Sequence, residues 1–190
     1  CAVGSVFASP SVDQIASAIR NGNNGSGVLC VLGNYGGDVM NFEMACEIVK
    51  SEGIETRMII VSDDIASASN EDKLKRRGIA GLIFAFKIAG ASSENGATLE
   101  EVYDLTLKAN NNLRTIGVAV SSCILPEVGK PTFELESDEI EIGMGIHGEP
   151  GIKREKLRKA DLLVDDLCKI IFEDFELSNS DKVSIMINSL

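Results

Sequence analysis

The sequence is poor in basic residues and holds a single histidine among its 190 residues, with no tryptophan and only four prolines. Its 18 lysines and arginines are outnumbered by 29 aspartates and glutamates, so the formal net charge is −11. Such a charge repels phosphate backbones and anionic lipids, and we expect neither direct nucleic-acid binding nor membrane binding. The one basic run, residues 73–77, is predicted to be a solvated helix face or a partner contact.

Cysteine patterns that hold a metal or a disulfide are also missing. The five cysteines form no CxxC pair and have no histidine at metal-ligand spacing; they are Cys1, Cys30, Cys46, Cys123 and Cys168. This scatter predicts reduced core thiols in a cytoplasmic protein and no metal site. No apolar run approaches the length of a membrane span.

What is present is enough apolar sequence for a substantial core, with 44% hydrophobic residues. Short aliphatic runs alternate with helical patterns through the first part of the chain, which predicts an α/β fold with a layered, mostly parallel sheet. Strand-rich sequence follows, so we expect two lobes, residues 1–118 and 119–190. Both ends are apolar and lack a lead-in or cap, which predicts a piece truncated at both ends.

In the first lobe we expect helices at residues 11–20, 39–50 and 99–113 and strands at 28–32 and 56–61. Ligands of open parallel sheets bind beyond the carboxyl ends of strands. The loops in that region carry Asp38 after the first strand and Asp63 and Asp64 after the second.

In the second lobe the spacing predicts a helix over residues 156–172 with an apolar stripe, and four strands. The strands are expected at residues 118–122, 132–135, 139–146 and 182–188.

The only histidine, His147, lies in the segment GMGIHGEPG, directly after the alternating run at 139–146. Glycines on both sides leave room for a small molecule and permit unusual backbone angles. The pattern is typical of a reactive imidazole, but a single histidine in a turn is more often a surface or hydrogen-bonded residue than a catalyst.

Asp38 ends the glycine-rich loop GNYGGD between a predicted strand and a predicted helix. The loop matches neither GxGxxG nor GxxxxGK[ST], so no nucleotide site is indicated. Asp38 has two interpretations that the residues leave open. It is either the N-cap of the following helix or a carboxylate able to take a proton from a substrate hydroxyl.

Three other candidates carry weaker signals. Asp63 and Asp64 are better explained as residues capping a turn than as cation ligands. Ser121 lies in a run of small residues without a GxSxG elbow, which favours tight strand packing over a nucleophile. Lys87 lies in an apolar context, FAFKIAG, and is either a desolvated catalytic amine or a partnered structural charge.

Taken together, these segments resemble the dihydroxyacetone kinase family, specifically its K-type subunit or domain, which holds the triose substrate. The residues that carry the resemblance follow one another in order over most of residues 1–151. They are residues 7–10, 33–42, 76–81, 87–91, 121–123, 129–131 and 141–151.

The resemblance implies that His147 attacks the ketone of dihydroxyacetone and holds it as a covalent hemiaminal. It implies that Asp38 accepts the proton of the terminal hydroxyl during phosphoryl transfer. Ser9, in the family's pocket loop, is expected to contact the substrate, as are the glycines of the GNYGGD loop, Gly33, Gly36 and Gly37. The family's GGGSGHEP segment, with its assisting histidine, is expected upstream of residue 1.

The family also implies partners. The nucleotide, ATP or ADP with magnesium, is expected on a separate L-type subunit or domain, recharged in some systems by a phosphocarrier protein, and the K-type chain is expected to be a homodimer. One departure matters here, because Gly33 stands where the commonest kinases have lysine, which removes a cation from the pocket. Some relatives with this pattern resemble kinases of four-carbon ketoses, such as erythrulose. Another paralog is a dihydroxyacetone-sensing coactivator of a TetR-type transcription factor.

Overall fold

The computed structural model describes residues 1–126, 128–175 and 177–188. Its first half is built on two parallel strands, β1 (Val28–Gly33) and β2 (Thr56–Val61), paired from Val28 opposite Thr56 to Gly33 opposite Val61. Both strands are rich in aliphatic residues, as expected for a sheet covered on both faces. The predicted α/β fold with a parallel sheet is confirmed.

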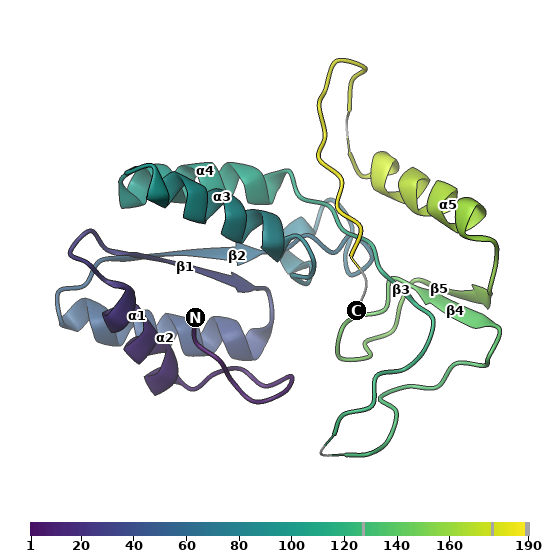
Figure 1. Ribbon diagram of the computed structural model, residues 1–190, viewed down its shortest axis with the longest axis horizontal. Coiled ribbons are helices and arrows are strands. Elements are labelled where there is room, and N and C mark those ends of the chain that lie inside the picture. Colours follow the sequence, from purple (N-terminus) through teal and green to yellow (C-terminus); the bar gives the residue numbers. More distant parts are fainter. Residues whose placement is uncertain (127, 176, 189–190) are drawn as a thin grey trace.

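Two helices cover each face of this sheet (Figure 1). Helices α1 (Val12–Gly22) and α2 (Gly36–Ser51) pack on one face, and α3 (Leu82–Glu94) and α4 (Leu99–Asn111) on the other. Ile15, Ile19 and Val49 form the first apolar cluster, and Ile59, Val61 and Ala85 form the second. The fold therefore fixes the carboxyl ends of β1 and β2 from both sides.

The helix starts follow from local capping. Ser11 and Gln14 form a capping box at α1, and Thr98 and Glu101 form one at α4. Helix α2 instead begins at Gly36, with Tyr35 as an N-cap that makes no side-chain capping bond. The N-cap interpretation of Asp38 is therefore wrong, because the helix starts before the predicted Val39 and Asp38 lies in its first turn.

The second half carries an antiparallel sheet of β3 (Val118–Ala119), β4 (Glu139–Ile142) and β5 (Lys153–Lys156), followed by α5 (Ala160–Glu173). The predicted strands at 132–135 and 182–188 are wrong, since both segments are irregular in the described chain. Strand β5 was not predicted. Because it extends to Lys156, the helix begins at Ala160 and not at the predicted residue 156. The predicted lobe boundary after residue 118 falls inside β3 and stays a prediction.

The basic run at 73–77 is only partly solvated. Lys73 and Lys75 are exposed, whereas the Arg76 side chain is 1% exposed and binds Asp174 just after α5, with Nη1 2.8 Å from Oδ2. Arg114 binds the same carboxylate. The prediction of a solvated face is wrong for Arg76, because a carboxylate from the far end of the chain neutralises it.

All five cysteines are free in the structure, and Cys1 and Cys123 are exposed, so the core position predicted for these two is wrong. Among the described residues, no helix is both long and apolar enough to cross a membrane.

Candidate functional site

His147 lies in a tight turn that follows β4. The Gly145 N–H donates to the Glu149 carbonyl at 2.9 Å, and the Gly148 N–H donates to the Gly145 carbonyl at 3.0 Å. Gly148 has a φ of +87°, a conformation that favours glycine. The glycines around the histidine are therefore needed for the turn that presents it.

Glu149 contacts His147 with both carboxylate oxygens. Its Oε2 accepts the backbone N–H of His147 at 3.0 Å, and its Oε1 lies 3.0 Å from the ring Nδ1. Burial opposes ionisation of Glu149, yet bonds from its own backbone and from His147 hold the pKa of this carboxyl below its usual range. In a neutral imidazole, an ionised Glu149 favours the tautomer with the proton on Nδ1, and that tautomer has its lone pair on Nε2. The ring is thus oriented and 31% exposed.

Two aromatic rings flank the imidazole. Phe7 and Tyr35 meet it edge-on, with ring centroids 4.9 Å and 5.0 Å away. Phe7 has a φ of +56°, which a bulky residue rarely adopts, and so the N-terminal loop is constrained at the point where it touches His147. The Tyr35 hydroxyl is buried without a hydrogen-bond partner among the described residues. Burial and the nearby Glu149 charge raise the pKa of Tyr35.

Ser9 lies against the start of α2. The Asn41 side-chain amide donates to Ser9 Oγ at 3.2 Å and to the Pro10 carbonyl at 2.9 Å. A Cβ added to Gly37 would lie 3.8 Å from the Ser9 Cβ. The structure therefore brings the predicted residues Ser9 and Gly37 together.

The other predicted residues of this loop have different surroundings. A Cβ added to Gly33 would lie 3.2 Å from both the Gly78 carbonyl oxygen and the Tyr35 ring, so a side chain there requires Tyr35 to shift. Gly36 faces open space. Asp38 is half-buried on the first turn of α2, three residues after Tyr35. Within the described chain no hydrogen bond or ion pair ties its side chain to His147.

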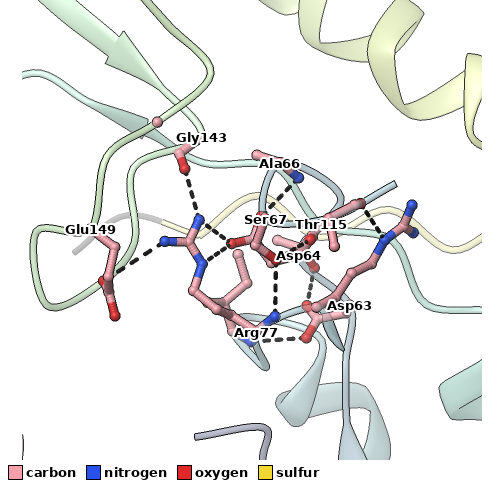
Figure 2. Close-up of polar contacts among 12 residues, drawn as sticks. Asp63, Asp64, Ala66, Ser67, Arg77, Thr115, Gly143 and Glu149 are labelled. Atoms are coloured by element: carbon pink, nitrogen blue, oxygen red, sulfur yellow. Dashed lines mark hydrogen bonds and ion pairs between the residues drawn. The ribbon is translucent and has the colours of Figure 1, made fainter. Parts of the chain in front are cut away.

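Behind the histidine turn, Arg77 and Asp64 form a support that Figure 2 shows. Arg77 Nη2 lies 2.7 Å from Asp64 Oδ2 and donates to the Gly143 carbonyl at 3.0 Å. Its Nη1 lies 3.8 Å from Glu149 Oε2. Sequence reasoning missed the roles of Glu149 and Arg77; the available signal for Glu149 was an acid two residues after the only histidine.

Asp63 is a structural residue, as the turn interpretation predicts. Its carboxylate accepts the backbone N–H groups of Ile79 and Gly81, each at 2.8 Å, and the Thr115 hydroxyl. Both oxygens of this buried group are thus occupied by donors from the segment that begins α3. The described residues hold no cluster of three or more His, Cys, Asp or Glu arranged for a metal ion.

Lys87 and Ser121 lie outside the site. Lys87 is exposed on α3, so it is not a desolvated amine, and Ser121 is exposed beyond β3. Ser121 lines a surface hollow of about 510 Å³ whose lining lacks His147, Asp38 and Ser9.

Comparison with known proteins places these features in a family. The family description "Dak1 domain" matches residues 1–190. The PTS-dependent dihydroxyacetone kinase 1, dihydroxyacetone-binding subunit DhaK, of Listeria innocua is 46% identical over 98% of this chain and 57% of its own length. The L-erythrulose 1-kinase of Mycolicibacterium smegmatis is 41% identical over 98% of this chain and 34% of its own.

Among solved structures, the dihydroxyacetone kinase operon co-activator Dha-DhaQ superposes with a TM-score of 0.82 at 32% identity, covering 89% of this chain and 52% of that one. The chain spans about half the length of the curated DhaK relative that it matches.

Proposed function

This chain belongs to the Dak1 domain family, and from that premise we propose that it is the substrate-binding part of a kinase for dihydroxyacetone or a related short ketose. His147 is the covalent anchor and Asp38 the general base. The observation that carries the proposal is the double contact of Glu149 with the backbone and ring of His147. It leaves Nε2 free as the nucleophile.

The covalent step balances within this geometry. The Nε2 lone pair forms a bond to the carbonyl carbon, the C=O π pair moves to oxygen, and that oxygen takes a proton from water, which becomes hydroxide. The ring, now positively charged, releases its Nδ1 proton to Glu149, whose Oε1 lies 3.0 Å from Nδ1, and Glu149 passes that proton to the hydroxide, so no proton is gained or lost. Only a carbonyl compound forms this adduct, so ketoses and short aldehydes are selected over polyols.

The phosphoryl step belongs to Asp38 and a partner. In this proposal Asp38 accepts the proton of the terminal substrate hydroxyl as that oxygen attacks the phosphoryl donor. The donor is ATP, or ADP with magnesium recharged by a phosphocarrier protein, held on an L-type subunit. The space around Gly36 is open at the start of α2, near Asp38, and this supports access of a phosphoryl donor on a partner subunit to Asp38. We infer a homodimer for the K-type chain.

The test uses full-length protein with dihydroxyacetone labelled with ¹³C at the carbonyl. We expect the ketone signal to convert to that of a tetrahedral carbon with wild type and with Lys87→Ala, whose side chain is exposed away from the site. His147→Ala should abolish the conversion. An adduct that survives in His147→Ala overturns the assignment. Product formed from dihydroxyacetone or erythrulose with an L-type partner then identifies a kinase.

A second candidate is a ligand-sensing coactivator of a TetR-type regulator. The similarity to the co-activator structure favours it, as does glycine at position 33. In that case the adduct forms on His147 without product, under conditions in which a known K-type subunit turns over.

A further inference from the structure

Arg77 joins three separate segments of the chain through one guanidinium group (Figure 2). Its Nε and Nη2 contact Asp64 Oδ2 at 2.8 Å and 2.7 Å, and Nη2 also donates to the Gly143 carbonyl at 3.0 Å. Nη1 faces Glu149 Oε2 at 3.8 Å. The side chain is 13% exposed, so these contacts are largely shielded from water.

Asp64 and the Arg77 backbone are themselves held in place by hydrogen bonds. Asp64, 1% exposed and just beyond β2, accepts the Ala66 N–H at 3.1 Å with the oxygen that Arg77 does not contact. Burial raises the pKa of Asp64, and the Arg77 charge opposes that shift. The Arg77 backbone is also fixed, because its N–H donates to Ser67 Oγ at 2.9 Å and its carbonyl accepts the Asp64 N–H at 3.0 Å.

Gly145 provides the space for the contact with the histidine turn. A Cβ at this position would overlap both the Glu149 carboxylate and Arg77 Nη1. The missing side chain therefore lets the guanidinium face the carboxylate that binds the His147 ring.

We propose that Arg77 is a positioning residue for His147, holding Glu149 and the Gly143 carbonyl at fixed places relative to Asp64 and the end of the parallel sheet. The inference rests on the proposed function, since it assigns Arg77 to the same site. Lysine does not replace it, because one ammonium group cannot reproduce the planar fork that reaches Asp64, Gly143 and Glu149 together. Without the fork, the histidine turn loses its polar link to Asp64 at the end of β2, and Nε2 is displaced from the attacking position.

The first experiment separates positioning from folding. Arg77→Gln alone leaves the buried Asp64 charge without its partner, so it is compared with Asp64→Asn/Arg77→Gln, in which both charges are removed and the Asp64 side chain keeps its shape. In full-length protein whose melting temperature shows it to be folded, we expect the equilibrium constant for the dihydroxyacetone adduct to fall about 10- to 100-fold in both variants and in Arg77→Lys.

The second readout does not depend on substrate. In protein labelled with ¹⁵N-histidine, the His147 signal is identified by its absence from His147→Ala, and its nitrogen shifts report which ring nitrogen carries the proton. We expect a single Nδ1–H form in wild type and a mixture of tautomers in the Arg77 variants. A merely structural role for Arg77 would not change this ratio in a folded variant.

A matched glycine pair covers the case in which the Arg77 variants do not fold. Gly145→Ala keeps the Asp64–Arg77 pair but forces Arg77 and Glu149 apart, and we expect the same mixed tautomers and weakened adduct. Gly117→Ala, in the same neighbourhood, would place its Cβ no closer than 4.0 Å to any atom beyond its chain neighbours and should behave as wild type.

The outcomes distinguish the two proposals. If wild type forms no adduct with His147, the proposed function fails, whereas the tautomer ratio still decides the role of Arg77. If wild type forms the adduct and both Gly145→Ala and the folded Arg77 variants keep its equilibrium constant and the single tautomer, the positioning role is overturned.

Discussion

Arg76 and Asp174, far apart in the sequence, form a two-pronged ion pair in which Arg76 Nη1 lies 2.8 Å and Nη2 2.5 Å from the two carboxylate oxygens. Arg76 is 1% exposed and Asp174 14%. The contact matters because α5 contains no fully buried residue. This ion pair, together with the contact of Arg114 with the same carboxylate, joins the end of the helix to the first half of the chain.

We expect Asp174→Asn to destabilise the protein by about 3–5 kcal/mol, because it leaves the buried Arg76 charge without its partner. Chemical denaturation of the full-length protein gives the free energy of unfolding. Glu173→Gln, an exposed neighbour at the same helix end, is the matched control and should change little. Equal stabilities of the two variants would contradict the importance of the ion pair.

The same pair predicts a pH dependence. Burial opposes ionisation of Asp174, but Arg76 and Arg114 outweigh it and lower the pKa of Asp174 below its ordinary value of 3.8. The stabilisation is therefore complete above that ordinary value and is lost as the pH falls through the lowered pKa. The stability difference between wild type and Asp174→Asn should shrink progressively below about pH 4. A difference that stays constant down to pH 2 would show that the carboxylate charge is irrelevant.

Glu149→Gln keeps the shape of the side chain but replaces an anionic acceptor of Nδ1–H by a neutral one. A hydrogen bond to a charged group contributes roughly 1.5–3 kcal/mol, so we expect the adduct equilibrium constant to fall about 10-fold or more. Titration with ¹³C-labelled dihydroxyacetone measures it, with Glu71→Gln as an exposed control. An unchanged constant would mean that Glu149 does not assist His147.

Asp38→Asn should retain the adduct while lowering phosphoryl transfer by about 100-fold or more, because a positioned base contributes roughly 10²- to 10⁴-fold. Steady-state turnover with an L-type partner, beside the adduct signal, separates the two effects. Glu43→Gln, exposed on the same helix, controls for a charge change on α2. Wild-type turnover in Asp38→Asn would leave Asp38 only a favourable charge at the start of the helix.

The sequence predicted best where a local signal decides the structure. Ser11 with Gln14 marks the start of α1, and the aliphatic run at 56–61 became β2 as predicted. Helix α3 was missed, because Leu82–Glu94 is apolar on most of its surface and shows no clear period. The predicted strand at 182–188 has an alternating pattern, yet no described strand pairs with it.

Within the candidate site, the histidine turn was recognisable from its glycines and its family motif. The support formed by Arg77 and Asp64 was not recognisable. The role of Arg77 depends on Asp64 and on the turn near Gly145, and no local sequence pattern indicates that these segments meet. The basic run was interpreted as a solvated face for the same reason. A charge pattern reports the number of charges but not which distant carboxylate neutralises each one.

The contact of Phe7 and Tyr35 with His147 also bears on the order of events during synthesis. Phe7 and Tyr35 are synthesised before β2. His147 is synthesised only after both strands of the parallel sheet and β4. Contacts between such distant residues close late, since the intervening chain must first lose its freedom. We therefore expect the nascent chain to fold its first core well before His147 reaches Phe7 and Tyr35, the arrangement on which the proposed ketose binding depends.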